Sequence, residues 1–339
     1  MKPIRMIRPD TLSLITSYRC TAACPNCCFN CSPHPVNDKI MTLEEMRRYI
    51  SLAKEDFPDL SVVVFTGGEC TLLGEDLYNA IKFAKSIGLI TRIVTNGHWA
   101  KSESNADETI NNLLDSGLDE INFSTGLEHS IFTPVEVVAY AVSKCVRTSR
   151  FSQVFVNIEL SKGSNINRDS FMSLSWIAEL DDELRNRVVC ISSPWIEFRH
   201  HNKLTGHDEN TYRVSHKGCA EVLTTININP NGQFLSCCGL ACEYTPFLKL
   251  GQIHSCIKSI HETRFQDLLK LWLFVSGPYQ ILKKIGNPPE HTNKHNCEYC
   301  MNLLMRRENL NRLMNLSREE VENILLDYNL KVHNYEKLN

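Results

Sequence analysis

The sequence has 339 residues, of which 42% are hydrophobic and 22% are charged, and its formal net charge is -3. This composition is typical of a folded globular protein, and the charge gives no reason to expect a nucleic-acid partner. The N-terminus is too charged for a signal peptide, and no apolar run approaches the ~20 residues that span a bilayer. We therefore expect a cytoplasmic protein without a membrane partner.

From residue 10 to about residue 195, short apolar runs alternate with segments of helical period, which is typical of β-α-β units around a parallel sheet. Six strands are predicted, at Leu12–Thr16, Val62–Thr66, Ile90–Thr95, Glu120–Ser124, Val154–Leu160 and Val188–Ser192. The clearest helices are predicted at Thr42–Asp56, Leu77–Ile87 and Pro134–Arg147. In the first helix, Thr42 and Glu45 have the spacing of a capping box.

The alternation of apolar runs and helical segments ends at the polar stretch Arg199 to Lys217, which indicates a linker. Beyond it, Asn231-Gly232 between two apolar runs predicts a β-hairpin, because this pair favours a tight turn with positive φ. A helical region follows around Gln266–Phe274, and a last helix is predicted to begin near Ser317, with Glu320 in capping position. The pattern predicts four parts, over residues 1–198, 199–218, 219–316 and 317–339.

Fifteen cysteines in a reducing compartment favour metal or redox chemistry over disulfides. Three of them, Cys20, Cys24 and Cys27, form a Cys-x3-Cys-x2-Cys loop directly after the first strand. Each iron of a cubane cluster needs a ligand besides its sulfides, so three thiolates leave one iron free to bind another group. A zinc site and unrelated surface thiols are the alternatives for such a triplet.

Two further motifs follow predicted strands, Thr66-Gly67-Gly68-Glu69 after the second and Thr95-Asn96-Gly97 after the third. Residues at the C-terminal ends of parallel strands line the site of a barrel. Glycines there let the backbone approach a ligand closely, and a carboxylate accepts hydrogen bonds from an ammonium group. These motifs predict a binding site at that end of the sheet.

The cysteine loop after strand one and Gly-Gly-Glu after strand two together resemble the radical S-adenosylmethionine (radical SAM) enzymes. The resemblance implies an α/β fold with a partial (β/α)6 TIM-like barrel in which Cys20, Cys24 and Cys27 hold a 4Fe-4S cluster. The free iron would chelate the methionine amino and carboxylate groups. By the same likeness, the site residues for S-adenosylmethionine are Gly67, Gly68, Glu69 and Ser124. One departure is Asn26, which stands where the family usually has an aromatic residue near the adenine.

The second half is similar to the auxiliary-cluster domain called Twitch. Its ligands would be Cys219, Cys237, Cys297 and Cys300. Four thiolates imply a fully ligated second 4Fe-4S cluster, whose role would be electron transfer or structural support. A structural zinc also takes four closed thiolate ligands and is the alternative.

The run Cys27-Cys28-Phe29-Asn30-Cys31 and the doublet Cys237-Cys238 resemble those of the radical SAM peptide epimerases. The resemblance implies a deoxyadenosyl radical that takes a Cα hydrogen from an L-residue of a ribosomally made precursor peptide. Cys238 would return a hydrogen to the opposite face and give the D-residue. A flavodoxin or ferredoxin would be the electron donor. The alternative for Cys238 is a buried thiol that serves packing alone.

Other outcomes stay open on the sequence. A related radical SAM/Twitch reaction would dehydrogenate or crosslink a peptide or small molecule, and a non-catalytic protein would hold structural zinc. For Cys28 and Cys31 loop packing is favoured, and the alternatives are a role as substitute ligands or as a second thiol pair near the first cluster. Cys242 is close enough to the doublet to be a backup donor or ligand, and the sequence does not decide its role. Because the predicted barrel begins near the first residue, we expect no N-terminal leader-recognition domain.

Overall fold

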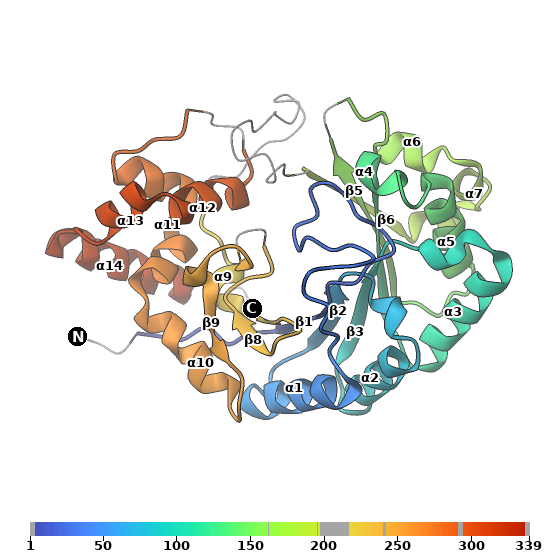
Figure 1. Ribbon diagram of the computed structural model, residues 1–339, viewed down its shortest axis with the longest axis horizontal. Coiled ribbons are helices and arrows are strands. Elements are labelled where there is room, and N and C mark those ends of the chain that lie inside the picture. Colours follow the sequence, from blue (N-terminus) through green and yellow to red (C-terminus); the bar gives the residue numbers. More distant parts are fainter. Residues whose placement is uncertain are drawn as a thin grey trace.

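A computed structural model describes residues 4–161, 163–194, 196, 217–239, 242–290 and 294–335. One nine-stranded sheet runs through it, in the order β6-β5-β4-β3-β2-β1-β7-β8-β9 (Figure 1). The strands are β1 Thr11–Ser17, β2 Val62–Gly67, β3 Ile90–Thr95, β4 Glu120–Gly126, β5 Gln153–Leu160, β6 Val188–Pro194, β7 Thr225–Ile228, β8 Gln233–Leu235 and β9 Lys249–Gln252.

All six strands predicted for the first half are present, and each pairs in parallel with its neighbour in sequence. Their apolar side chains are buried because helices cover the outer side of the sheet, where Figure 1 shows α1, α2, α3 and α5. The mixed α/β class and the barrel-like arrangement of these strands are confirmed.

The helices of the first half follow the strands in turn. They are α1 Leu43–Asp56, α2 Glu75–Ser86, α3 Glu103–Asp115, α4 Leu127–Ser130, α5 Val135–Arg147, α6 Arg168–Met172, α7 Ser175–Ala178 and α8 Asp182–Asn186, with short 3-10 turns η1 Cys70–Leu73 and η2 His98–Lys101. The predicted capping box of α1 is present, because Thr42 accepts from the Glu45 N–H while Glu45 accepts from the Thr42 N–H.

The predicted hairpin is β7 and β8, and it continues the sheet of the first half. β7 pairs in parallel with β1, with Thr11 opposite Thr225, and the antiparallel strands β8 and β9 extend the same sheet. The cysteines near this hairpin are therefore held beside the first cysteine loop, which follows β1.

The remaining helices lie beyond the hairpin. They are α9 Glu221–Thr224, α10 Ile257–Thr263, α11 Leu268–Lys284, α12 Asn296–Met305, α13 Arg307–Leu313 and α14 Arg318–Tyr335, with 3-10 turns η4 Pro246–Leu248 and η5 Arg264–Gln266. Of these, α10 packs against α1, and α11 to α14 lie on the opposite side from α2 to α5 (Figure 1). The predicted cap at Ser317 and Glu320 is confirmed by their two reciprocal hydrogen bonds. Most of the predicted linker, residues 199–216, lies outside the described residues.

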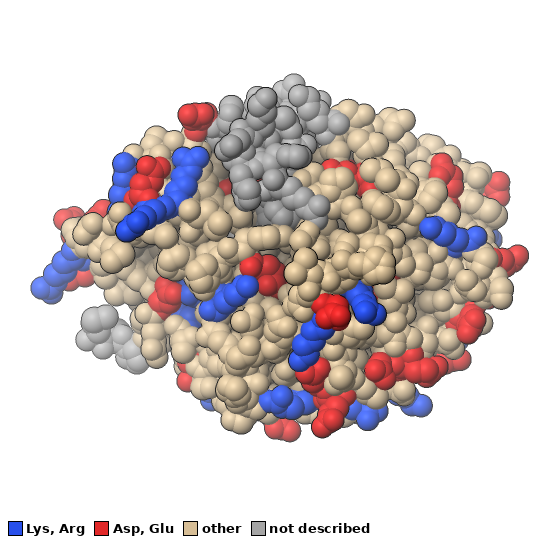
Figure 2. Space-filling model, in the orientation of Figure 1, with Lys and Arg blue, Asp and Glu red and all other residues tan. Residues whose placement is uncertain are grey.

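Two hydrophobic cores result. One lies between the sheet and the helices α1 to α3, α5 to α8 and α10, and the other lies between β1, β8 and the C-terminal helices. Cysteines of both halves of the sequence border the second core, among them Cys20, Cys27, Cys237 and Cys300. On the face in Figure 2, Lys and Arg are interspersed with Asp and Glu. Within the described part of the chain, no helix combines the length and the apolar character needed to cross a membrane.

Candidate functional site

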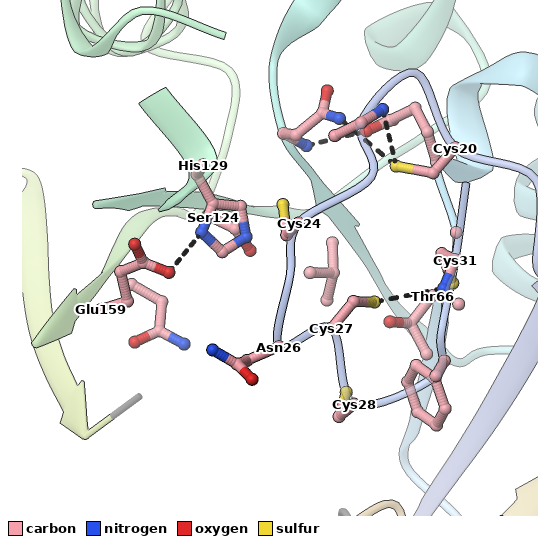
Figure 3. A pocket seen from close by; sticks show the side chains of 18 of the residues that line it. Cys20, Cys24, Asn26, Cys27, Cys28, Cys31, Thr66, Ser124, His129 and Glu159 are labelled. Atoms are coloured by element: carbon pink, nitrogen blue, oxygen red, sulfur yellow. Dashed lines mark hydrogen bonds and ion pairs between the residues drawn. The ribbon is translucent and has the colours of Figure 1, made fainter. Parts of the chain in front are cut away.

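The cysteine loop leaves β1 and folds back on itself. The Cys20 N–H donates to the Ser32 carbonyl at 3.0 Å, and the Ser32 N–H donates to the Tyr18 carbonyl at 3.2 Å. Within the loop, the Cys27 N–H donates to the Cys24 carbonyl at 3.1 Å. The three cysteines therefore sit on a closed loop at the C-terminal end of β1, where the sequence places them (Figure 3).

Gly67 and Gly68, at the end of β2, allow the cysteine loop to approach that strand. A methyl group on Gly68 would lie 1.8 Å from the Arg19 carbonyl oxygen, and one on Gly67 would lie 2.5 Å from the Ser17 carbonyl oxygen. The Gly68 N–H donates to Ser17 at 2.7 Å. The backbone that packs closely against these glycines is that of Ser17 and Arg19, which leads into the cysteine loop. The two glycines therefore help to position the cysteines.

Glu69 joins the ends of β2 and β3. Its carboxylate is 1% exposed and accepts from the Thr95 hydroxyl at 2.7 Å, the Thr71 hydroxyl at 2.7 Å and the Asn96 N–H at 2.8 Å. These bonds satisfy most of its acceptor capacity within the protein. Glu69 therefore fixes the shape of the strand ends, besides any contact it makes with a ligand.

One cavity of about 350 Å³ brings the two halves of the sequence together. Its barrel side includes Gly67, Gly68, Glu69 and Ser124, and its loop side includes Cys20, Cys24 and Cys27. Cys238, Gly239 and Cys297 of the second half also line it. The site residues predicted around the first loop and the predicted hydrogen donor thus face the same space.

The second cysteine set begins at Cys219, which a break in α11 positions. Gly277 has φ 74° and Pro278 has no N–H, so the helix cannot complete its own bonding there. The freed carbonyl of Leu273 accepts from the Cys219 N–H at 2.9 Å, and that of Phe274 accepts from the Lys331 ammonium at 2.5 Å. The irregularity in α11 is what anchors this cysteine.

Two of the other cysteines of that set, Cys237 and Cys297, lie beside Gly239. A methyl group on Gly239 would lie 3.0 Å from Cys297 Sγ and 3.7 Å from Cys237 Sγ. Cys297 and Cys300 are in the first turns of α12 and share a helix face because they are three residues apart. Burial raises the pKa of Cys300, and the thiols of Cys237, Cys297 and Cys219 raise it further. The four proposed ligands therefore neighbour one another.

The thiols of the first loop differ in their ionisation. Burial raises the pKa of Cys20 to about 12, with a further contribution from the charge of Glu69, and burial also raises the pKa of Cys24. Hydrogen bonds from the thiols of Cys28 and Cys31 lower the pKa of Cys27. Cys28 and Cys31 thus support the third cysteine, which the sequence left open as packing or alternative ligands.

Cys238 is exposed to the cavity, while its neighbour Cys237 is tied to the buried thiol of Cys242. The protein around the cavity desolvates Cys238 and raises its pKa, so it stays a protonated thiol at neutral pH. The hydrogen bond from Cys242 lowers the pKa of Cys237. The adjacent cysteines are therefore one thiol suited to donate hydrogen and one suited to bind metal.

A network on β4, α4 and β5 was not predicted from the sequence. Glu128 accepts from the Asn26 backbone N–H at 3.1 Å and from Asn26 Nδ2 at 2.7 Å. Next to it, Glu159 Oε2 bonds His129 Nδ1 at 2.9 Å, and Figure 3 shows this pair beside Ser124 and Cys24. Asn26, which replaces the expected aromatic, thus clamps the loop to the barrel. The Asn26–Glu128 contact joins residues 102 positions apart and the Glu159–His129 contact joins residues 30 apart, so no local pattern signals them.

The residues present fit an iron-sulfur cluster on the first loop. Backbone N–H groups point at its sulfur atoms, from Ala22 to Cys20 Sγ at 3.4 Å and from Cys31 to Cys27 Sγ at 3.4 Å. Such donors stabilise thiolates. Among the described residues, no group of three His, Cys, Asp or Glu side chains is arranged so that it could hold a single metal ion. The ligands of a cubane bind different irons and need not converge on one point.

Comparison with known proteins agrees with this geometry. The curated "Putative peptide biosynthesis protein YydG" of Bacillus subtilis (strain 168) is 25% identical over 175 residues, and the match spans about half of each chain, 51% in both cases. Native anSMEcpe with bound AdoMet has a TM-score of 0.54 at 12% identity, over 93% of this chain and 99% of its own. Its complex with AdoMet and Kp18Cys peptide also scores 0.54 at 12% identity, over 95% and 100% of the two chains. These two structures share the fold.

The family model described as the Radical SAM superfamily matches residues 14–174. That range begins in β1 and contains the cysteine loop, the Gly-Gly-Glu motif and Ser124. The part of the chain that is similar to the radical SAM superfamily is therefore the part that contains the cysteine loop and the strand ends around it.

Proposed function

We propose that this protein is a radical SAM enzyme, and that it is a peptide epimerase that inverts an L-residue of a ribosomally made peptide. The observation that carries the proposal is the shared cavity, in which Cys238 faces the same space as Cys20, Cys24 and Cys27. An epimerase needs a group that removes hydrogen from one face of a carbon and a donor that returns hydrogen to the other. The cavity offers a wall for each.

Cys20, Cys24 and Cys27 would hold the first 4Fe-4S cluster, and Gly67, Gly68, Glu69 and Ser124 would border S-adenosylmethionine. When bound, these two groups supply the deoxyadenosyl radical that takes a Cα hydrogen. The chain's own task is positioning: Asn26 and Glu128 hold the loop, and the bonds of Glu69 fix the strand ends.

Cys238 would complete the inversion. Its S–H bond breaks, a C–H bond forms on the opposite face of the planar carbon, and a cysteine thiyl remains. One electron and one proton return the thiyl to the thiol. A second 4Fe-4S cluster on Cys219, Cys237, Cys297 and Cys300, in the Twitch-type part of the chain, would supply that electron. A flavodoxin or ferredoxin in the cytoplasm would be the external reductant.

A peptide as the substrate class is supported by the name of the Bacillus subtilis relative, "Putative peptide biosynthesis protein YydG", and by the fold shared with a structure that contains a peptide. S-adenosylmethionine would occupy much of a cavity of about 350 Å³. A peptide would therefore have to reach into the cavity from outside. We therefore place the peptide across the cavity mouth, with the reacting residue inserted toward Cys238.

The test replaces Cys238 by alanine and compares it with Cys190→Ala, a thiol on β6 that contacts Met172. With precursor peptide and S-adenosylmethionine, Cys238→Ala should still form deoxyadenosine but no D-residue, whereas Cys190→Ala should form both. Normal inversion by Cys238→Ala would refute the donor role. A product two mass units lighter would identify dehydrogenation or crosslinking instead, and zinc without iron in the purified protein would identify a structural zinc protein.

A further inference from the structure

Asn96, the residue after β3, has one side-chain N–H directed at the sulfur of Cys20. Its Nδ2 lies 3.6 Å from Cys20 Sγ and 3.0 Å from the Thr21 hydroxyl oxygen. An amide NH2 group has two hydrogens, and these two acceptors take one each.

The orientation of the amide is determined by its surroundings. Its oxygen Oδ1 accepts from the His98 N–H at 3.0 Å, so the NH2 group must face the cysteine loop. The Asn96 backbone N–H donates to Glu69 Oε2 at 2.8 Å, and the residue is 7% exposed. Asn96 is thus held by three independent partners, and its contact with sulfur is built into the fold.

We propose that Asn96 is a positioning residue that donates an N–H···S hydrogen bond to the Cys20 thiolate and thereby raises the reduction potential of the cluster on that loop. Reduction adds negative charge to a cluster and its thiolates. A hydrogen bond to a ligand sulfur stabilises that charge and shifts the potential upward. The inference rests on the proposed function, in which Cys20 is a cluster ligand.

The contact between Asn96 and Cys20 also connects the Gly-Gly-Glu motif to the cysteine loop. Glu69 holds the Asn96 backbone, and Asn96 in turn reaches the Cys20 sulfur, so the end of β2 acts on the cysteine loop through the end of β3. The Ala22 N–H is the other described donor to Cys20, at 3.4 Å. Removing the Asn96 amide leaves that backbone bond in place, so the effect of the side chain can be measured alone.

The experiment measures the potential of the reconstituted chain by redox titration with electron paramagnetic resonance. The signal to follow is the one that changes when S-adenosylmethionine is added, which separates the first cluster from a second one. Asn96→Leu has nearly the same shape and no donor. We expect its reduction equilibrium to become about tenfold less favourable, a shift of 59 mV to a lower potential for one electron.

Two further variants keep the result interpretable. Thr21→Val removes the other acceptor of the amide and leaves the N–H···S bond, so its potential should match the wild type within about twofold in the equilibrium. Asn96→Asp keeps the Oδ1 acceptor for His98 but removes the donor, and its potential should also fall. It serves as the second variant if Asn96→Leu does not fold.

A direct readout uses protein labelled with ¹⁵N-asparagine. Pulsed electron paramagnetic resonance of the reduced wild type should detect a weakly coupled ¹⁵N nucleus that is lost in Asn96→Asp. Equal potentials in iron-replete wild type and Asn96 variants would overturn this inference and leave the proposed function standing. A wild-type chain that binds no iron at the cysteine loop would overturn both.

Discussion

At the scale of single residues, the carboxylate of Glu69 has a structural task that its motif does not reveal. The Gly-Gly-Glu motif suggests a group that meets a ligand, whereas in the fold Glu69 accepts from Thr71, Thr95 and Asn96. A buried carboxylate is acceptable at such a position because several donors compensate its charge. Substitution of Glu69 should therefore lower the stability of the protein even when no ligand is bound.

Glu69→Gln should lower the free energy of unfolding by about 2 kcal/mol, because one of the donors that now meets a carboxylate would face an amide NH2 group. Denaturant titration of the metal-free protein measures the change. Glu179→Gln, at an exposed position, is the matched control and should change it by less than about 0.5 kcal/mol. Equal stability of Glu69→Gln and wild type would contradict the structural task.

At the scale of elements, the predictions succeeded where a pattern is local. Thr42 with Glu45 and Ser317 with Glu320 predicted helix starts, and both caps form. Contacts that join distant segments were not predictable in this way. Asn26 meets Glu128, and β7 pairs with β1, because tertiary packing brings these segments together and no spacing in the sequence encodes it.

The contact between β2 and the cysteine loop gives an element-scale prediction. Gly68→Ala should displace the loop, because the added methyl group would lie 1.8 Å from the Arg19 carbonyl oxygen. We expect a loss of about 2 kcal/mol in stability and a clear fall in iron bound after reconstitution.

Gly163→Ala is the control for this variant, since nothing lies within 4 Å of the added methyl group, although its φ of 78° adds a backbone strain that Gly68 does not have. It should lose about 1 kcal/mol through backbone strain and bind iron as the wild type does. Full iron binding by Gly68→Ala, measured by iron and sulfide analysis, would show that the loop does not depend on this close approach.

At the scale of the whole molecule, His261 and Arg264 tie the N-terminal segment to the hairpin. His261 Nε2 bonds the Ile7 carbonyl at 2.8 Å, and Nδ1 accepts from Arg264, which also donates to the Val222 and Thr225 carbonyls. Burial, together with the charge of Arg264, lowers the pKa of His261 to about 3. The imidazole is therefore neutral in the folded protein.

This pair predicts a pH dependence of stability. Below pH 6.5 the unfolded chain binds a proton at His261 that the folded chain excludes until about pH 3, so stability should fall as pH decreases through that window. The slope from this group is up to about 1.4 kcal/mol per pH unit. His261→Gln should flatten the decline relative to wild type, while His254→Gln, at an exposed position, should not. Identical profiles for wild type and His261→Gln would contradict the assignment.

The central claim is that a peptide Cα is inverted in the shared cavity, because hydrogen is removed from one face of the carbon and Cys238 returns hydrogen to the other. The most direct measurement incubates the peptide with the enzyme, reductant and S-adenosylmethionine in heavy water, followed by chiral and mass analysis. We predict one deuterium at one Cα, that residue in the D configuration, and no other change of mass, because the Cys238 thiol exchanges with solvent. A product that has lost two hydrogens, or an inverted residue without solvent deuterium, would contradict the account.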